Sequence, residues 1–441
     1  MNRVRQFVLL ISDLAVLYIS LILALWLRYR GEFYDQFKED HLIPFSFIFA
    51  VWIVIFYVAG LYDLRKLRNG LEFIKTLSLS IFVNSLLAIS LFYLIPTLGI
   101  APKTNLFLFI AIFAILETYW RRVFNRAISS GEAHSRVLLI GNGASTEAIK
   151  EAIRTNPQLG YEIPVSLKED QVNESTNLRK VVEENSINYI VVPRHLKKDT
   201  KLTNTLYDLL TSGAEVRDLP NFYELIFRKI PLADLEEAWF LENLIGHQKF
   251  YDPLKRAGEF MIALILGIGL LPLEILIALL IKATSPGSII YRQERVGKSG
   301  KSFLLYKFRT MTVDAEKNGA KWADPNDMRA TPLGKILRHT HLDELPQLWN
   351  VLKNELSFVG PRPERPEFVR LLQEKIPYYE IRHIVKPGVT GWAQINYKYG
   401  ASVEDAYEKL QYDIYYLKNR SLILDISTMI RTIKSFFVNQ E

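Results

Sequence analysis

The chain contains no cysteine among its 441 residues. Disulfides, a thiol nucleophile and cysteine-ligated zinc are therefore excluded. The absence also fits a reducing compartment such as the cytosol. Acidic residues are fewer than basic ones, with 47 Asp and Glu against 54 Lys and Arg, so the formal net charge is +7. A positive excess either solvates an ordinary surface or attracts anionic lipid headgroups and phosphorylated ligands.

Long apolar runs are abundant, and hydrophobic residues make up 49% of the chain. Four such runs occupy the first 126 residues, at 7–27, 43–61, 76–95 and 106–120. A membrane-crossing helix needs roughly 20 predominantly apolar residues, which the fourth run reaches only with its flanks. The first run is too long for a signal peptide and lacks a small-residue cleavage site. The pattern predicts a four-helix transmembrane region over 1–126.

Basic residues flank these runs unevenly. They precede the first run, separate the second from the third and follow the fourth, as at Arg3, Arg5, Lys75, Arg121 and Arg122. Because basic flanks stay on the cytosolic side, we expect both ends of the region, and everything after residue 121, to be cytosolic. Asp13 lies inside the first run. It is either an intramembrane functional group or a polar residue that faces the interior of the bundle.

A fifth apolar run covers 260–281, yet both of its flanks are basic. Lys255 and Arg256 precede it, and Lys282 follows it. Both flanks therefore favour the cytosolic side. Pro272 lies in the middle of the run, where proline removes a backbone hydrogen bond and bends a helix. We expect a re-entrant helix over about 258–282 that breaks at Pro272 and returns to the side it entered.

The segment 134–247 has only short apolar runs. Those at 137–140, 189–192 and 214–219 predict strands, and their alternation with helical stretches predicts a small, Rossmann-like parallel α/β domain. Gly141 and Gly143 follow the first strand, but Thr146 stands where a dinucleotide fingerprint has its third glycine. Acidic residues lie downstream, and none clearly ends a second strand. A cofactor-binding turn and a purely structural turn both remain open.

The segment after residue 283 carries the candidate chemistry. Two strands are expected at 289–295 and 303–308, and alternation along the second places Lys307 and Arg309 on one face. This face either contacts phosphate or is an ordinary basic strand face. His339 and His341 fit no metal-ligand spacing, so we interpret them as structural.

Asp343 and Glu344 are adjacent carboxylates at the start of a predicted helix. Leucines at helical spacing follow them, and Pro346 is tolerated only in a first helical turn, so the helix is expected to begin near Asp343. The helix dipole would then keep Asp343 ionised and help to hold a phosphate. By themselves, the two residues are better explained as N-terminal capping acids, and only the rest of the segment favours a catalytic role.

Arg362 lies between Pro361 and Pro363. The prolines stiffen its backbone, which favours a bidentate phosphate contact, although a rigid structural turn would have the same sequence. The end of the chain, 407–437, mixes apolar, aromatic and basic residues. It is expected either to lie on a membrane surface or to form a core-packed helix pair.

These motifs together resemble those of the bacterial sugar transferases, the monotopic polyprenyl-phosphate phosphoglycosyltransferases. The matching stretches are Gln293-x-Arg295-x-Gly297, 306–311, 342–345, 350–352, 357–363 and 387–394. The resemblance covers the predicted catalytic domain, 251–441, which is expected to be an α/β domain. The upstream helices and α/β domain resemble the large members of the family in architecture only.

The resemblance implies a two-step reaction on a UDP-sugar. Asp343 would attack the β-phosphate, UMP would leave, and polyprenyl (undecaprenyl) phosphate would then remove the phosphosugar from Asp343. Mg²⁺ would bind at Asp343 and Glu344, with Glu344 either positioning the metal or assisting proton transfer. The basic residues assigned to substrate phosphate are Lys307, Arg309, Arg338, Arg362 and Lys398.

The expected partners are therefore a UDP-sugar, polyprenyl phosphate and membrane lipid, and no nucleic acid. The expected place is the cytoplasmic face of the bacterial inner membrane, in the initiation of exopolysaccharide, O-antigen or capsule synthesis. The sequence leaves the sugar undefined, and a homodimer is one of the assemblies open to it. Two other interpretations are a membrane-anchored nucleotide-dependent sensor or oxidoreductase that uses 134–247, and a non-enzymatic scaffold for polysaccharide assembly.

Overall fold

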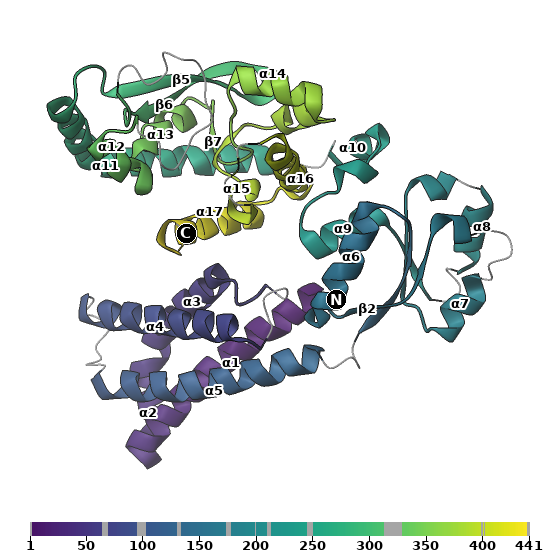
Figure 1. Cartoon of the computed structure of the whole chain (residues 1–441). Coiled ribbons are helices and arrows are strands. Elements are labelled where there is room, and N and C mark those ends of the chain that lie inside the picture. Colours follow the sequence, from purple (N-terminus) through teal and green to yellow (C-terminus); the bar gives the residue numbers. More distant parts are fainter. Residues whose placement is uncertain are drawn as a thin grey trace. The chain divides into compact units, whose positions relative to one another are not determined.

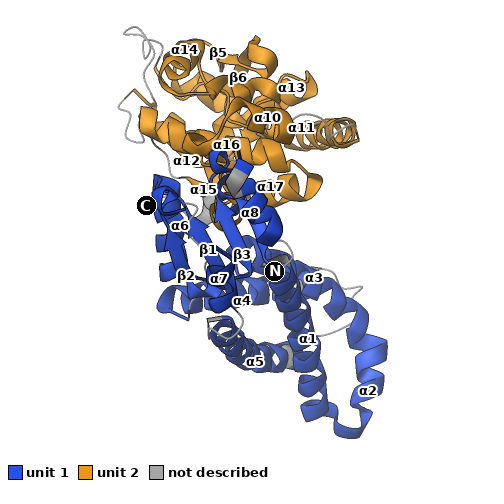
Figure 2. Cartoon of the chain, turned by 90° about the vertical axis from the view of Figure 1, so that its right-hand side faces the viewer, with its two compact units in different colours: residues 1–222 blue, residues 223–441 orange. Residues whose placement is uncertain are grey.

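The computed structural model describes residues 2–63, 69–94, 103–129, 134–172, 178–198, 200–209, 213–244, 250–312, 329–397, 400 and 402–438. The chain divides into two compact units, Met1–Phe222 and Tyr223–Glu441 (Figure 2). The first unit contains a helical bundle and a parallel sheet. The second contains a long apolar helix, a β-hairpin and a group of short helices.

In the described residues, the bundle has four long helices that coincide with the predicted apolar runs, and a short helix between the first two runs (Figure 1). They are α1 (Asn2–Tyr29), α2 (Phe33–Gln36), α3 (Leu42–Ala59), α4 (Leu71–Leu94) and α5 (Lys103–Ser129). Three stretches of the described chain are long and apolar enough to cross a membrane: Val4–Ala59, Leu71–Phe92 and Tyr251–Thr284. The first of these contains both α1 and α3. Because α5 is not among the three, a fourth span stays a prediction.

Asp13 lies in the interior of this bundle. Its carboxylate pairs with Arg121 of α5, which also donates to Glu117 at 2.7 Å and to the carbonyl of Leu61 at 2.7 Å. All three charged side chains are fully buried. A buried charge is tolerated only when it is paired, so this cluster fastens α1, α5 and the end of α3 together. Of the two interpretations of Asp13, the structure supports the interior-facing polar residue.

The predicted parallel α/β arrangement is present between residues 135 and 218. Its strands are β1 (Ser135–Ile140), β2 (Tyr161–Leu167), β3 (Tyr189–Val192) and β4 (Glu215–Asp218). Helices α6 (Ala144–Thr155), α7 (Leu178–Glu184) and α8 (Thr200–Leu209) lie between them in the sequence. The strand order is β2-β1-β3-β4, and each neighbouring pair is parallel.

Strand β2 is the one strand of this sheet that the sequence did not predict. It lies at the edge of the sheet, half exposed, and it contains Pro164, which cannot donate to a neighbouring strand. Edge strands tolerate proline because one side of the strand has no partner to satisfy. The strand therefore lacks the continuous apolar run by which the central strands β1 and β3 were recognised.

The second unit begins within α9 (Leu219–Phe227) and is built around the hairpin of β5 (Ile290–Val296) and β6 (Ser302–Phe308). The two strands pair in antiparallel register from Ile290–Phe308 to Val296–Ser302, which confirms the predicted hairpin. A second, parallel pair joins β7 (Ser357–Val359) to β8 (Gly388–Thr390). The remaining helices are α10 (Glu237–Leu244), α11 (Tyr251–Thr284), α12 (Pro332–His339), α13 (Gln347–Leu352), α14 (Pro366–Lys375), α15 (Trp392–Asn396), α16 (Val403–Asn419) and α17 (Leu422–Val438).

Helices α10, α14 and α16 share one apolar core. Trp239 of α10 packs in it with Leu372 of α14 and with Leu410 and Ile414 of α16, and all four are buried. Helix α16 is therefore a core helix. For this part of the segment 407–437, the structure supports the core-packed interpretation over a position on the membrane surface. Residues between 230 and 244 contribute to this core, so they pack with the second unit.

Helix α11 runs for 34 residues with Pro272 inside it. Its first half contacts the unit through Ala263, which packs with Leu305 and Val351. Its second half contacts the same unit through Ile281, which packs with Phe308. Both halves of the helix therefore lie against one domain.

The outward side of α11 is apolar. Ile265, Ile268 and Leu279 are 63%, 67% and 63% exposed, respectively. An exposed apolar face of this length marks a surface that lipid covers.

Candidate active site

Three of the predicted site residues meet at one carboxylate oxygen. The Nζ atom of Lys307 on β6 lies 2.6 Å from Oε1 of Glu344, and Nη2 of Arg362 lies 3.3 Å from the same oxygen. The side chains come from the hairpin, from the turn before α13 and from the loop after β7. The fold thus brings residues separated by up to 55 positions into one charged cluster.

The acidic pair does not lie inside an α-helix, so the predicted helix start near Asp343 is wrong. Leu342–Glu344 form a single 3-10 turn, and α13 begins only at Gln347. The reason is Pro346, which has no N–H to donate to the carbonyl four residues earlier. His341, with φ of 55°, turns the chain sharply between α12 and this 3-10 turn.

Glu344 is held as a carboxylate by its two cationic partners. Burial alone would raise its pKa, but the charges of Lys307 and Arg362 outweigh that effect and lower the pKa to about 2. The side chain is only 13% exposed, so the ion pairs are shielded from water. Glu344 is therefore ionised at neutral pH and fixes the positions of both cations.

Asp343 has the opposite environment. Burial raises the pKa of its carboxyl group, and the opposing charge of Lys307 does not fully offset this. Among the residues that the structure describes, none forms an ion pair or a hydrogen bond with its side chain, although it is only 7% exposed. A desolvated carboxylate without a partner is a more reactive nucleophile than a paired one. The environment therefore distinguishes the two adjacent acids, because burial raises the pKa of Asp343 while the two cations lower the pKa of Glu344.

Arg362 extends from a loop whose backbone is held at several points. Gly360 N–H donates to the carbonyl of Thr390, and Gly388 N–H donates to the carbonyl of Pro361, both at 2.9 Å. A Cβ atom on Gly388 would lie 2.1 Å from the nitrogen of Gly360, so only glycine permits this approach. With its carbonyl also bound by Arg382 at 3.0 Å, Arg362 keeps a fixed backbone while its side chain remains 42% exposed.

Arg295 is a further site residue, to which the sequence analysis gave no role. It lines a small pocket together with Lys307, Arg362, Pro363 and Gln347. Its Nη1 atom donates to the carbonyl of Pro363 at 2.8 Å. The signal for it was present in the hairpin register, because Arg295 pairs with Phe303, and positions 303 and 307 share a face of β6.

The other predicted phosphate-binding residues are less closely placed. Arg309 donates to the carbonyls of Pro286 at 2.6 Å and Ser285 at 2.9 Å, so it holds the turn that follows α11. Arg338 on α12 contributes positive charge that lowers the pKa of Asp343. Lys398 lies outside the described residues.

The membrane helix is tied directly to the backbone of this site. Arg256 donates to the carbonyls of Val351 at 2.6 Å and Leu352 at 2.9 Å, at the end of α13. Lys255 donates to the carbonyl of Val359 at 2.8 Å, three residues before Arg362. The first turns of α11 therefore support both the helix that follows the acidic pair and the strand that leads to Arg362.

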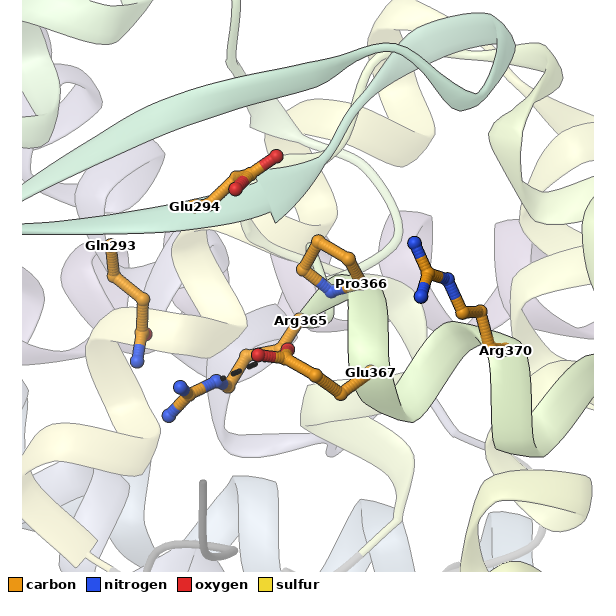
Figure 3. Close-up of a pocket in the computed structure, with 6 residues that line it drawn as sticks. All are labelled: Gln293, Glu294, Arg365, Pro366, Glu367 and Arg370. Atoms are coloured by element: carbon orange, nitrogen blue, oxygen red, sulfur yellow. Dashed lines mark ion pairs between the residues drawn. The ribbon is translucent and has the colours of Figure 1, made fainter. Parts of the chain in front are cut away.

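A larger pocket of about 260 Å³ lies beside the hairpin (Figure 3). It is lined by Gln293, Glu294, Arg365, Pro366, Glu367 and Arg370. Arg365 and Glu367 form an ion pair of 3.6 Å across it. Gln293 connects this pocket with the smaller one, because its amide oxygen accepts from Arg295 at 3.0 Å.

The donor set at the acidic pair suits one kind of metal ion. No group of three or more Asp, Glu or His side chains able to hold a metal occurs in the described part of the chain. Mg²⁺ does not require one, since it is often held by one or two carboxylates with substrate phosphates and water. Asp343 and Glu344 fit such a shared site, in which a phosphorylated substrate supplies most of the ligands.

A buried acidic pair among cations, on a domain with a long exposed apolar helix, is typical of a membrane-associated enzyme that acts on phosphorylated substrates. The family model described as "Bacterial sugar transferase" matches residues 250–439. The chain belongs to the bacterial sugar transferase family, as its motifs predicted.

Three relatives illustrate the match. The UDP-glucose:undecaprenyl-phosphate glucose-1-phosphate transferase of Escherichia coli (strain K12) is 31% identical over 69% of this chain and 68% of that protein. The protein of the same name from Klebsiella pneumoniae is 27% identical over 93% of both chains. The UDP-N-acetylgalactosamine-undecaprenyl-phosphate N-acetylgalactosaminephosphotransferase of Aeromonas hydrophila is 43% identical over a match that covers 44% of this chain. The same match covers 47% of the length of that relative.

Proposed function

We propose that this enzyme transfers a hexose-1-phosphate from a UDP-sugar to undecaprenyl phosphate, releases UMP and so initiates the synthesis of a surface polysaccharide. The observation that carries the proposal is the division of labour between Asp343 and Glu344. One acid is buried without a hydrogen-bond or ion-pair partner among the described residues, while the other holds two cations at the same site. The names of the relatives supply the acceptor and the donor class.

In the first step, a carboxylate oxygen of Asp343 attacks the β-phosphorus of the UDP-sugar. A new P–O bond forms to Asp343, and the bond between that phosphorus and the bridging oxygen breaks, so the bridging oxygen leaves with UMP. In the second step, a phosphate oxygen of undecaprenyl phosphate attacks the same phosphorus. The acyl-phosphate bond then breaks, the Asp343 carboxylate is restored, and the product is the polyprenyl diphosphate sugar.

The cations serve these steps by their positions. Lys307 and Arg362 share Oε1 of Glu344 and retain donors for phosphate oxygens, and Arg295 adds a third positive charge to the same pocket. Fixed donors stabilise charge on a transferring phosphoryl group without reorganising during the reaction. Mg²⁺ bound at Asp343 and Glu344 would neutralise negative charge on the diphosphate.

We place the reaction at the cytoplasmic face of the inner membrane, with α1, α3, α4 and α5 crossing it and α11 entering only one leaflet. The contacts of both halves of α11 with one domain support the re-entrant arrangement, because a crossing would separate its two ends by the membrane thickness of about 30 Å. Helix α11 continues through Pro272 without interruption, and a bend at this proline is what such a path would require.

The direct test is UMP release by the purified full-length protein, supplied with undecaprenyl phosphate, Mg²⁺ and each of a panel of UDP-sugars. We expect one UDP-sugar to yield UMP and a polyprenyl diphosphate sugar in equal amounts. Without undecaprenyl phosphate, UMP release should stop at one equivalent per enzyme, because the phosphosugar remains on Asp343. If no sugar in the panel yields UMP, the proposed activity is wrong.

The path of α11 is tested by cysteine labelling, for which the chain has no background thiol. Leu254→Cys and Ala283→Cys lie near the two ends of the helix, and both native side chains are exposed. We expect a membrane-impermeant maleimide added outside spheroplasts to label neither, and to label both after lysis. Glu32→Cys, between α1 and α3, is the external control. Labelling of only one end in intact spheroplasts would contradict the re-entrant path.

A further inference from the structure

The carboxyl ends of the strands in the parallel sheet form a second candidate site, separate from the acidic pair. In the order β2-β1-β3-β4, the chain leaves β1 toward one side for β2 and returns to the other side for β3. The strand order therefore reverses between β1 and β3, and such points leave a crevice where open α/β sheets bind ligands. The residue after β1 touches the residue after β3, since a Cβ on Gly141 would lie 3.3 Å from Pro193.

The turn after β1 presents backbone donors. Gly141 has φ of +142°, which favours glycine, and the turn leads directly into the twelve-residue helix α6. Gly143 is the N-cap of α6, and no side chain caps the helix there. Asn142, Gly143 and Ala144 are all exposed. Uncapped N–H groups at the start of a helix attract anions, phosphate above all.

An independent feature points to a ligand at the same place. Thr146, in the first turn of α6, is fully buried, and its hydroxyl group has no hydrogen-bond partner in the described part of the chain. The hydroxyl is directed at the turn, because a Cβ on Gly141 would lie 2.7 Å from it. A buried hydroxyl without a partner lowers the stability of the fold, and a bound phosphate or its water would supply the missing hydrogen bond.

The sheet also places an acid where a ribose would lie. Strand β2 ends at Leu167, and Glu169 lies two residues beyond it, so an acidic residue does follow a second strand, which the sequence interpretation did not recognise. The backbone N–H of Glu169 donates to Asn142 of the glycine turn at 3.2 Å. Its carboxylate lies 2.9 Å from His195, which follows β3. An acid after the second strand is the usual acceptor for ribose hydroxyl groups in such sheets.

We propose that this edge of the sheet binds a ribonucleotide, with its phosphate at the Gly141–Gly143 turn and its ribose at Glu169. The site is built from β1, β2, β3 and α6, and it uses none of the residues assigned to sugar-phosphate transfer. The ribonucleotide is either a dinucleotide cofactor or the uridine nucleotide that the proposed reaction releases. Both present the same phosphate and vicinal hydroxyl groups, and binding measurements with each distinguish them.

The test uses full-length protein in nanodiscs and equilibrium dialysis with labelled NAD⁺, UMP and pyrophosphate. Gly143→Asp places a carboxylate at the N-cap, which suits the helix but repels phosphate, and φ of −81° accommodates the side chain. We expect it to weaken nucleotide and pyrophosphate binding at this site at least tenfold. The matched variant Gly143→Ala adds a methyl group without charge and should retain binding.

Glu169→Gln separates the ribose from the phosphate. It should weaken nucleotide binding about tenfold and leave pyrophosphate binding unchanged, while Asp170→Asn should change neither. All four variants should retain wild-type UMP release, which keeps this proposal separate from the proposed reaction. UMP should also bind at the transfer site. The quantity to compare is therefore the number of UMP molecules bound per protein, which should be lower by one in Gly143→Asp than in the wild type. If the wild type binds neither NAD⁺ nor UMP in excess of Gly143→Asp, the site does not exist.

Discussion

Replacing Asp343 by asparagine should lower turnover by roughly four orders of magnitude or more, the scale of loss found when a nucleophile is removed. The amide has the same size but cannot attack phosphorus, so UMP release should stop along with formation of the phosphosugar adduct. Intact-mass measurement after mixing with the UDP-sugar checks the adduct directly. Asp252→Asn, an exposed acid at the start of α11, is the matched control and should retain both activities.

The same variant should be more stable than the wild type. Burial raises the pKa of Asp343, so ionising it in the folded state costs free energy that the unfolded chain does not incur. That loss of stability is absent below the unfolded pKa and grows as pH rises through the folded pKa. Asparagine removes it, so Tm in the same detergent should rise at pH 7 and converge with the wild type in acid. An inactive Asp343→Asn with a lowered Tm would indicate a damaged fold instead of a missing nucleophile.

Replacing Lys307 by methionine should lower kcat by about 10²–10³-fold, the usual effect of removing one fixed donor to a charged transition state. The ammonium group lies 2.6 Å from Glu344 and faces the pocket shared with Arg362. Methionine keeps the apolar stem and removes the charge. Lys307→Arg should recover much of the loss, whereas Lys335→Met, on the exposed face of α12, should have no effect.

The pH profile distinguishes this role from a merely structural one. In the wild type, Glu344 has a pKa of about 2 because the two cations outweigh its burial, so it remains ionised throughout the working range. Its contribution to stability is present above the unfolded pKa and is lost only as pH falls through about 2. Without Lys307 the pKa must rise, and the acid limb of kcat should move to higher pH. An unchanged limb would mean that Lys307 does not set the charge state of Glu344.

The local elements were predictable wherever one periodicity dominated. A local sequence pattern was sufficient to predict three kinds of element: the long apolar helices, the central strands β1 and β3, and the hairpin β5–β6. Strand β2 was not predicted, because an edge strand that contains a proline has no such pattern. The helix start at Asp343 was misplaced because leucine spacing continues into the turn, whereas the missing N–H of Pro346 decides where α-helical bonds begin.

The roles within the site depended on contacts between distant segments. Nothing near Glu344 in the sequence indicates that Lys307 and Arg362 share one of its oxygens. For the same reason, the sequence could not distinguish Arg309, which binds the turn after α11, from Lys307, two positions away. Arg295 could have been found, because the hairpin register already placed it on the face that carries Lys307.

The hydrogen bonds from Lys255 and Arg256 have a practical consequence for anyone who wishes to make a water-soluble form of this enzyme. These two side chains bind the carbonyls of Val359, Val351 and Leu352, and they belong to the helix that truncation would delete. Excision would remove these charged donors and so weaken the support of the backbone on both sides of the charged cluster, although Val359 and Val351 each keep a further donor, from Tyr416 and from Asn354. Solubilisation should therefore proceed by substituting the lipid-facing side chains of α11 while its first two turns are retained.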